Sequence, residues 1–264
     1  MKITALVENM SSCELKPKHG LSLYIETEKH KILFDVGPDE TLFENAKRRG
    51  IDLTKVDTVI ISHGHLDHGG ALKHFLEVNH TAKVYIQREA FEKHYTKVLG
   101  IRFFCGIKED CKSHPQVVLL DGDYRIDEEL LLFTVKDKSR CYSTMNDALY
   151  EGKEKDQFNH EQHLMIQDEK PVLIMGCGHS GVVNIMKEAE QYHPTVCVGG
   201  YHLTNPNSKK MVPEQLLDEI ASSLNQYKGV KFYTCHCTGQ KVFEYLSKKM
   251  DDLSYLSCGQ VIEC

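Results

Sequence analysis

The sequence predicts an α/β (α+β) protein built as a four-layer αββα sandwich, in which two mixed sheets pack face to face with helices outside. Two observations predict this class. Short runs of β-branched and aliphatic residues alternate with segments of helical periodicity along nearly the whole chain. Four of these runs end in turns that combine glycine with histidine, cysteine or threonine; the turns follow Ile61, Met175, Gly200 and Thr234. Because α/β sheets present their chemistry at strand ends, we expect these four turns to converge on one site.

The composition is that of an ordinary globular protein. The chain has 264 residues, of which 41% are hydrophobic and 27% are charged, and this length suffices for one large domain. We therefore expect a single domain over residues 1–264. The net charge of −6 gives no reason to expect nucleic acid as a partner.

No apolar run reaches the length of a membrane span, and the first residues lead directly into a strand rather than a signal peptide. The expected location is therefore the cytoplasm, without membrane attachment. The ten cysteines are scattered along the chain, and we expect reduced thiols rather than a disulfide framework.

The N-terminal segment predicts a run of strands before the first helix. These strands lie at residues 2–9, 21–27 and 30–35. Asp35 ends the third strand in front of Gly37, and on the sequence alone it is as well explained by a turn as by a functional role. A helix at residues 40–49 follows and is stopped by Gly50.

The densest chemistry lies between a strand at residues 56–61 and a helix at residues 71–77. Four candidate metal ligands fall within six positions there: His63, His65, Asp67 and His68. A helix cannot gather them on one face, because positions two apart point about 200° from each other. A tight turn can, and imidazole and carboxylate are ligands that zinc, iron and manganese accept. The segment from Ser62 to Gly70 therefore predicts a metal site rather than a polar surface loop.

These residues resemble a known family. The segment His63-Gly64-His65-Leu66-Asp67-His68 has the His-x-His-x-Asp-His pattern of the metallo-β-lactamase fold superfamily, and Phe34-Asp35-Val36-Gly37 is similar to its upstream aspartate motif. Two later segments resemble a narrower branch: Gly176-Cys177-Gly178-His179-Ser180-Gly181 and Cys235-His236-Cys237-Thr238-Gly239. That branch includes the methanopterin-pathway synthase of a dihydropterin-methyl ribofuranosylaminobenzene phosphate and many uncharacterised hydrolases. The resemblance runs from about Ile3 to the C-terminus. It implies one metallo-β-lactamase-like domain in which Asp35 orients a ligand histidine by hydrogen bonding.

After a strand at residues 82–87 the pattern becomes irregular, and the favoured interpretation of the next segment is a covering helix and loop. Cys105, Cys111 and His114 lack the spacing of a compact zinc knuckle. In the superfamily that the chain resembles, an insertion at this position shapes substrate access. We therefore expect a lid at about residues 89–115.

A second turn with candidate ligands follows a strand at residues 171–175 and opens into a helix at residues 182–193. It carries Cys177 and His179, where the superfamily usually has an aspartate at the first position. We favour His179 as a ligand. Cys177 is either a thiolate ligand or a buried thiol without a role in binding.

Two histidines are candidates for the superfamily's intermediate ligand. His160 and His163 are three residues apart at the entry to a strand. On an ideal strand they point to opposite faces, so at most one of them should reach the metals. The sequence leaves the choice open.

Two further strands end at the same predicted edge. The first, at residues 195–203, contains Gly200, where the backbone lets a substrate approach closely, and His202, a candidate general acid or anion contact that we favour over a structural histidine. The second, at residues 230–237, carries His236, which matches the final histidine ligand of the superfamily. We interpret its neighbours Cys235 and Cys237 as packing residues.

A helix begins at Thr238 and Gly239 and runs through Met250. Its free backbone N–H groups make these two residues a candidate phosphate seat. Residues 255–264 are expected to form a short closing strand.

We expect a metal-dependent hydrolase that activates water against an ester or phosphoester substrate. One zinc ion would be held by His63, His65 and His179 and a second by Asp67, His68 and His236, about 3.5–4 Å apart, with iron or manganese as alternatives. Asp67 would also act as a base and His202 as an acid. The positive potential at such a centre favours a small anionic substrate.

Two other functions stay open. The branch resemblance also implies a synthase that condenses a pterin with a ribosylaminobenzene phosphate. An iron-based redox or metal-sensing protein would use the same ligands together with nearby thiols. A purely structural zinc module is disfavoured, because six candidate ligands exceed a closed four-coordinate site. Oligomeric state and the identity of the substrate are not determined by the sequence.

Overall fold

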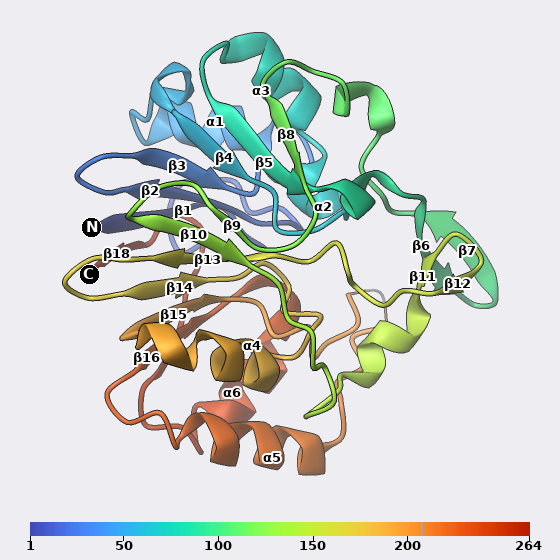
Figure 1. Ribbon diagram of the computed structural model, residues 1–264. Helices are drawn as coiled ribbons and strands as arrows, with labels where there is room; N and C mark the ends of the chain where they lie inside the picture. The colour runs from blue at the N-terminus through green and yellow to red at the C-terminus, as the bar shows by residue number, and fades with distance from the viewer. Residues whose placement is uncertain (207) are drawn as a thin grey trace. The chain divides into compact units, whose positions relative to one another are not determined.

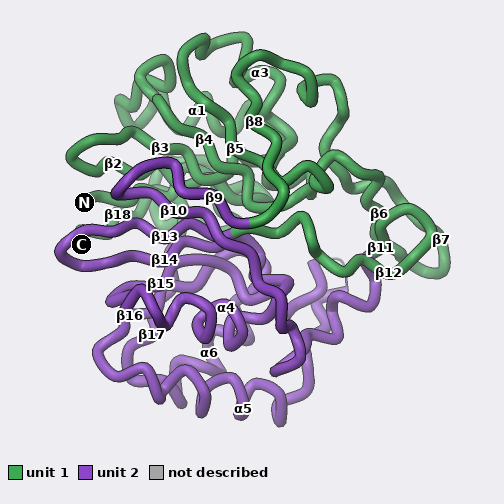
Figure 2. The backbone as a smooth tube through the Cα atoms, viewed as in Figure 1, with its two compact units in different colours: residues 1–122, 150–162, 257–264 green, residues 123–149, 163–256 purple. Residues whose placement is uncertain are grey.

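The apolar runs of the sequence form two seven-stranded sheets in the computed structural model, which describes residues 1–206 and 208–264 (Figure 1). The chain divides into two compact units (Figure 2). Unit 1 comprises residues 1–122, 150–162 and 257–264, and unit 2 comprises residues 123–149 and 163–256. Each unit contains one of the two sheets. The expected single domain stays a prediction.

The sheet of unit 1 has the strand order β18-β1-β2-β3-β4-β5-β8. Its strands are β1 (Lys2–Val7), β2 (Ser22–Glu26), β3 (Lys31–Phe34), β4 (Thr58–Ile60), β5 (Lys83–Gln87), β8 (Val117–Leu120) and β18 (Val261–Glu263). The first three strands form an antiparallel meander, whereas β3, β4, β5 and β8 run parallel. The chain ends meet at the sheet edge, where β18 pairs with β1.

Helices cover this sheet because their apolar residues recur at helical spacing. α1 (Thr41–Arg48) buries Leu42 and Ala46, and α3 (Leu72–Val78) buries Leu72 and Phe75. These side chains join one hydrophobic core with the β-branched residues of β4 and β5. α2 (Leu66–Gly69) is a single turn directly after the buried chain that leaves β4. Two 3-10 turns, at Leu53–Lys55 and Arg88–Phe91, connect the longer elements.

The segment at residues 89–115 differs from the expected covering helix. It forms a hairpin of β6 (His94–Val98) and β7 (Ile101–Phe104), followed by a 3-10 turn at Glu109–Cys111. Leu99 and Gly100 make the hairpin turn with φ angles of 49° and 86°. A four-stranded sheet results when β11 (Leu149–Glu151) and β12 (Glu154–Lys155) join in the order β12-β11-β6-β7. The helix prediction was wrong because aromatic and β-branched residues with a tight turn favour a hairpin. The lid role stays a prediction.

The sheet of unit 2 has the strand order β17-β16-β15-β14-β13-β10-β9. Its strands are β9 (Tyr124–Arg125), β10 (Leu130–Phe133), β13 (His163–Ile166), β14 (Val172–Ile174), β15 (Val196–Gly199), β16 (Lys231–Thr234) and β17 (Leu253–Tyr255). β14 to β17 are parallel, and β9, β10 and β13 are antiparallel to their neighbours. The parallel strands end in the three predicted turns of this unit.

Three helices pack on the sheet of unit 2: α4 (Val182–Ala189), α5 (Glu214–Leu224) and α6 (Gln240–Leu246). Their apolar faces share one core with the sheet, and 3-10 turns lie at Thr144–Ala148, Glu190–Tyr192 and His236–Thr238. Two sequence-based boundaries were wrong. β16 ends at Thr234, because the following residues form a 3-10 turn, and the expected closing strand is two strands, β17 and β18, in different sheets.

Both units are mixed sheets flanked by helices, which confirms the predicted α/β class. Among the helices of the described residues, none combines the length and apolar character needed to cross a membrane.

Candidate metal centre

The turn after β4 brings the four candidate ligands of unit 1 together. The ring of His63 lies 4.6 Å from that of His65 and 4.1 Å from that of His68, between ring centroids. An Asp67 carboxylate oxygen lies 3.9 Å from Nε2 of His68. His63 and His68 are buried, whereas the side chain of Asp67 is 25% exposed. Three imidazoles and one carboxylate therefore meet at the C-terminal end of a parallel strand.

Close packing of the backbone holds this turn. A Cβ on Gly64 would lie 2.4 Å from the carbonyl oxygen of Ala90, and a Cβ on Gly69 would lie 2.2 Å from the side chain of Ile107. Only glycine therefore fits at position 64, whereas a larger residue at position 69 would require the Ile107 side chain to move. The Gly64 carbonyl also accepts the N–H of Ile107 at 3.0 Å, so the loop between His63 and His65 is fixed on both sides of the peptide.

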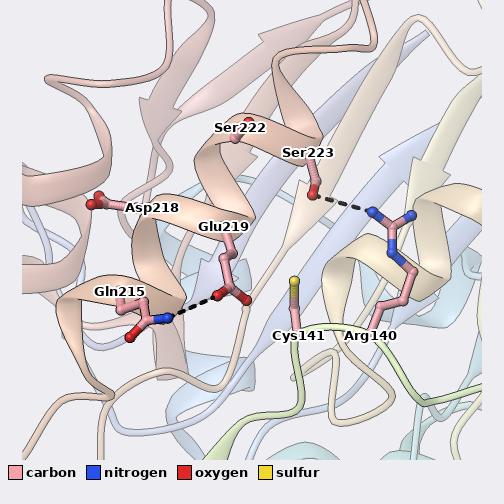
Figure 3. A pocket seen from close by; sticks show the side chains of 7 residues that line it. All are labelled: Arg140, Cys141, Gln215, Asp218, Glu219, Ser222 and Ser223. Atoms are coloured by element: carbon pink, nitrogen blue, oxygen red, sulfur yellow. Dashed lines mark hydrogen bonds between the residues drawn. The ribbon is translucent and has the colours of Figure 1, made fainter.

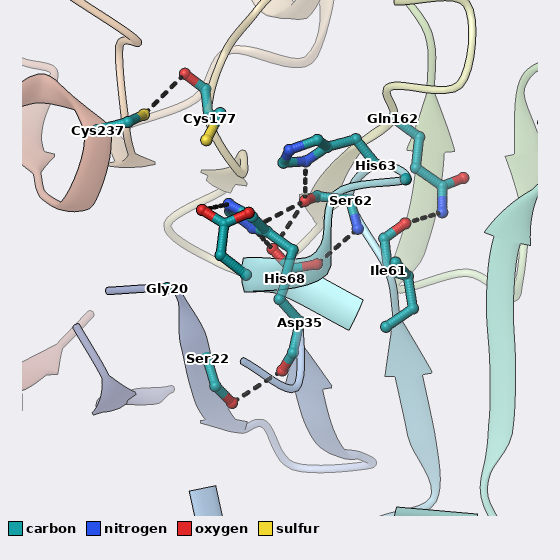
Figure 4. Close-up of polar contacts among 12 residues, drawn as sticks. Gly20, Ser22, Asp35, Ile61, Ser62, His63, His68, Gln162, Cys177 and Cys237 are labelled. Atoms are coloured by element: carbon teal, nitrogen blue, oxygen red, sulfur yellow. Dashed lines mark hydrogen bonds and ion pairs between the residues drawn. The ribbon is translucent and has the colours of Figure 1, made fainter. Parts of the chain in front are cut away.

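Asp35 is a buried hydrogen-bond hub behind the turn. Its carboxylate accepts the backbone N–H of Ser62 at 2.7 Å, the hydroxyl of Ser62 at 2.7 Å and Nδ1 of His68 at 2.6 Å (Figure 4). The aspartate has a φ of 61°, in the left-handed region that aspartate tolerates better than most residues. The hydroxyl of Ser22 donates to its carbonyl at 2.8 Å. Asp35 thus orients His68, the geometry that the family resemblance implies.

These hydrogen bonds assign the imidazole tautomers. His68 donates from Nδ1 to the Asp35 carboxylate, so the lone pair of His68 is on Nε2. The Ser62 hydroxyl donates to Asp35 and must therefore accept from Nδ1 of His63 at 2.8 Å, which places the lone pair of His63 on Nε2 as well. Burial lowers the pKa of His65 well below its usual value, so this imidazole is neutral. Neutral imidazoles are the form that binds metals.

In unit 2, the turn after β14 presents His179 in the same way. Nδ1 of His179 lies 2.9 Å from Oδ1 of Asn146, and Nδ2 of Asn146 donates to the carbonyl of His179 at 2.9 Å. The second bond fixes the orientation of the amide, so its oxygen accepts the Nδ1–H of His179. The lone pair of His179 is therefore also on Nε2. No sequence pattern indicated a role for Asn146, which lies in a stretch without a recognisable motif.

The other predicted residues of unit 2 gather around Cys177. Cys177, His179 and His202 offer ligand atoms within 4.8 Å of one another, and so do Cys177, His236 and Cys237. The rings of His179 and His202 are 4.1 Å apart. His202 and His236 have φ angles of 47° and 51°. Non-glycine residues in this left-handed region are strained and concentrate at functional sites.

Cys237 makes polar contacts in the interior of unit 2. Its sulfur accepts the backbone N–H of His202 at 3.3 Å. Its thiol donates to the carbonyl oxygen of Cys177 at 3.4 Å (Figure 4). Burial raises the pKa of its thiol, but the side chains of Cys177 and His202 and the charges on His236 and His202 outweigh burial and hold that pKa well below its usual value. Cys197, buried on β15 without such partners, has its pKa raised to about 12 by burial alone. Cys237 therefore has polar contacts in addition to its buried position, and its interpretation as a packing residue stays a prediction.

The chain is similar to known proteins in sequence and in fold. Residues 15–136 match the model of the Metallo-beta-lactamase superfamily. An uncharacterized protein of Methanocaldococcus jannaschii is 28% identical over 272 residues, covering 98% of this chain and 99% of that protein. The 7,8-dihydropterin-6-methyl-4-(beta-D-ribofuranosyl)-aminobenzene-5'-phosphate synthase of the same organism is 26% identical over 274 residues, covering 93% and 90%.

Among solved structures, Tm1679, a metal-dependent hydrolase of the beta-lactamase superfamily, superposes with a TM-score of 0.84 at 23% identity, over 100% of this chain and 99% of that one. The chain has the metallo-beta-lactamase fold. The resemblance inferred from the His-x-His-x-Asp-His motif is thereby confirmed, together with the similarity to the methanopterin-pathway synthase. A metallo-beta-lactamase fold implies divalent metal binding, and the His, Asp and Cys groups described above are its candidate ligands.

Within this metallo-beta-lactamase fold, the two intermediate histidines have different surroundings. Nδ1 of His160 accepts the backbone N–H of Gly64 at 3.0 Å, and its Nε2 lies 3.2 Å from a carboxylate oxygen of Asp156. Both ring nitrogens are therefore engaged within unit 1. His163 begins β13 in unit 2, where its buried ring packs 5.3 Å from that of Phe133.

The three candidate substrate-binding residues have internal packing roles. A Cβ on Gly200 would lie 2.5 Å from the sulfur of Cys237. The Thr238 hydroxyl accepts the backbone N–H of Tyr201 at 2.9 Å, and Gly239 has a φ of 80° beside the side chain of Thr204. These contacts explain the residue types within unit 2, and a substrate contact at these positions stays a prediction.

A separate depression of about 520 Å³ lies on the surface of unit 2, beside α5 (Figure 3). Its lining consists of Arg140, Cys141, Gln215, Asp218, Glu219, Ser222 and Ser223. None of the predicted site residues lines it. Its lining carries charges of both signs and offers one thiol and two carboxylates as possible metal ligands, with no histidine. The depression therefore does not resemble the histidine-rich candidate site.

The donor set in the fold suits a divalent cation. His63, His68 and His179 carry their lone pairs on Nε2, each with a hydrogen-bond acceptor on Nδ1. Metal-binding histidines typically have this arrangement, since the acceptor fixes the tautomer and the ring. The predicted ligands therefore fit a metal by their protonation as well as by their type.

Proposed function

We propose that the protein is a metal-dependent hydrolase that acts on a small anionic ester or phosphoester. The observation that carries the proposal is the set of tautomers around Asp35. This one buried carboxylate accepts the Nδ1–H of His68 directly and orients His63 through Ser62. In both histidines the lone pair is then on Nε2, where it can bind a metal. Burying polar nitrogen atoms in the interior of unit 1 costs free energy, so packing alone does not explain this arrangement.

The proposed ligands in unit 1 are His63, His65, Asp67 and His68. The family resemblance adds His179 and His236. Nitrogen and oxygen donors of this kind favour zinc, with iron or manganese as alternatives. When bound, such ions acidify water and polarise the ester or phosphoryl group.

The remaining roles belong to residues of the chain itself. Asp67 is the most exposed of the unit 1 ligands, and its carboxylate contacts Nε2 of His19 at 3.3 Å. A partly exposed carboxylate can accept the proton of an attacking water, and His19 is placed to share the charge. We assign His202 as the acid that protonates the leaving group. Asp35 holds His63 and His68 by hydrogen bonding, through Ser62 and directly.

The test begins with metal quantification of the purified protein. It continues with a panel of phosphodiesters, lactones, thioesters and β-lactams, each with and without a chelator. We expect stoichiometric metal, turnover of at least one substrate class and loss of turnover with chelator. His65→Ala should lose both metal and turnover while keeping its far-ultraviolet circular dichroism, whereas His30→Ala, at an exposed pair with Asp57, should keep both. Unchanged metal content and turnover in His65→Ala would refute the proposal.

A synthase reaction is the second candidate, favoured by the similarity to the pterin-coupled synthase over 93% of this chain. Incubation with a dihydropterin donor and a ribofuranosylaminobenzene phosphate distinguishes the two functions, because only a synthase forms the coupled product. An iron-based sensor is distinguished by metal analysis: zinc without redox-active iron excludes it.

A further inference from the structure

A buried cluster next to the metal loop has no role in the function proposed above. His94, Asp156 and His160 are all buried in unit 1, and each offers a ligand atom within 4.8 Å of His65 and of the others. His94 is the first residue of β6, and Asp156 follows β12, so the four-stranded sheet brings them together. Three histidines and a carboxylate at this spacing have the composition of a zinc site.

Hydrogen bonding decides against a metal there. The backbone N–H of Gly64 points at Nδ1 of His160, at 3.0 Å, so that nitrogen must carry a lone pair. The ring proton of His160 is therefore on Nε2, where it donates to Asp156 at 3.2 Å. A metal on Nε2 would need an imidazolate with both lone pairs in use. In this hydrogen-bonding arrangement neither ring nitrogen of His160 offers a lone pair to a metal.

Asp156 is the anchor of the cluster. One carboxylate oxygen lies 3.0 Å from Nδ1 of His94 and 3.2 Å from Nε2 of His160, and the other accepts the N–H of Phe158 at 2.7 Å. Nε2 of His94 is in turn 3.2 Å from the carbonyl oxygen of Glu89. The ring of His160 is thus held by the Asp156 carboxylate. That carboxylate is in turn fixed by His94 of β6 and by the backbone N–H of Phe158.

The same segment binds the loop at further points. Gln162 donates its backbone N–H to the Ser62 carbonyl at 2.8 Å and its side-chain amide to the Ile61 carbonyl at 2.8 Å (Figure 4). With the bond from Gly64 to His160, residues 160–162 contact three of the four residues at positions 61–64. The only side chain among these contacts that reaches the peptide between His63 and His65 is that of His160.

We propose that His160, held by Asp156 and His94, is a positioning residue that fixes the Gly64 peptide and thereby the spacing of His63 and His65. The inference rests on the proposed metal-binding function and deepens it. Loss of the His160 acceptor leaves a buried N–H without a partner. The loop then relaxes, and metal affinity falls about 10- to 100-fold, as for other outer partners of metal sites.

The decisive pair of variants is His160→Ala and His160→Asn. The Oδ1 atom of asparagine can occupy the place of Nδ1 and accept the Gly64 N–H, but asparagine has nothing at the place of Nε2. We expect His160→Ala to weaken zinc binding about 10- to 100-fold and His160→Asn to restore most of it. Affinity is measured by competition with a chromophoric chelator, and His30→Ala serves as the control for an exposed histidine–aspartate pair.

A second readout needs no metal. Hydrogen–deuterium exchange of the peptide containing Gly64, in chelator-treated protein, should be faster in His160→Ala and close to wild type in His160→Asn. Equal zinc affinity and equal exchange in wild type and His160→Ala would overturn the inference. It would also be overturned if His160→Asn lost zinc as fully as His160→Ala, because His160 would then be a ligand.

A different result would refute the proposed function without refuting the positioning role of His160. If His63→Ala keeps its zinc while the exchange results follow the expectation, the positioning contact stands and the metal assignment falls. If His160→Ala does not fold, His160→Asn alone still decides, since both the affinity and the exchange readouts apply to it.

Discussion

At the scale of single residues, the candidate site depends on side chains that orient the candidate ligands. Asp35 accepts three hydrogen bonds in a fully buried position, so its removal leaves the Ser62 N–H, the Ser62 hydroxyl and Nδ1 of His68 without their acceptor. Water cannot replace a carboxylate there without opening the core, and this makes the residue more costly to lose than its small size suggests.

We predict that Asp35→Ala lowers the free energy of unfolding by about 2–5 kcal/mol. The same substitution should weaken metal binding about 10- to 100-fold, because the His63 and His68 tautomers are no longer fixed. Urea unfolding of the chelator-treated protein measures the first effect and chelator competition the second.

Asp57→Ala is a matched control. Asp57 also accepts three hydrogen bonds, from His30, Lys31 and Thr58, but its side chain is 45% exposed, and water can take its place. Equal losses of stability in the two variants would contradict the role assigned to burial at Asp35.

At the scale of elements, sequence patterns predicted local strands, turns and helices. They did not predict contacts between side chains that are distant in the sequence. The strand before Ser62, the glycines of the turn and the helix at residues 72–78 follow from periodicity and turn chemistry, and the structure has them. Asn146 and Asp156 could not be predicted as partners of His179 and His160, because their stretch at residues 139–156 has no periodicity. Their contacts are made by side chains that the topology aligns.

The β6–β7 hairpin is the element whose role is most open to test. Leu99 at its tip is 98% exposed, and Ile101, Phe103 and Phe104 are also exposed. Exposed apolar side chains gathered on one element are typical of a binding surface, and here they favour contact with a substrate, as a lid would make.

We predict that Phe103→Ser combined with Phe104→Ser leaves the free energy of unfolding within about 0.5 kcal/mol of wild type. In the same variant, KM for the best substrate should rise at least several-fold while metal content stays unchanged. Tyr124→Ser, at an exposed aromatic residue of β9, should change neither quantity. A KM equal to that of wild type would leave the hairpin without a lid function.

At the scale of the whole molecule, the fold class could be predicted because each of the two sheets has its own run of apolar strands and helices. The candidate site residues could be predicted from one rule, that functional side chains in α/β sheets lie at the carboxyl ends of parallel strands. This rule selected the residues after β4, β14, β15 and β16. Protonation could not be predicted in this way. It depends on burial and on hydrogen-bond partners, which belong to the folded molecule as a whole.

The protonation of buried histidines makes the stability of the metal-free protein depend on pH. Burial lowers the pKa of His65 well below its usual value and also lowers that of His160, where the bond to Asp156 offsets burial in part. In the unfolded chain both histidines titrate near pH 6.5. Below that pH the unfolded state binds protons that the folded state does not, so stability must fall as the pH falls.

We predict that chelator-treated protein loses stability on going from pH 7.5 to pH 5.5. Each of the two histidines contributes a slope of up to about 1.4 kcal/mol per pH unit once the pH is below the unfolded pKa. Urea unfolding at several pH values measures this slope. His160→Asn removes one of the two groups and keeps the Gly64 contact, so its slope should be shallower. A metal-free protein that becomes more stable as the solution is acidified would mean that these imidazoles are protonated in the fold, a state in which they could not serve as ligands.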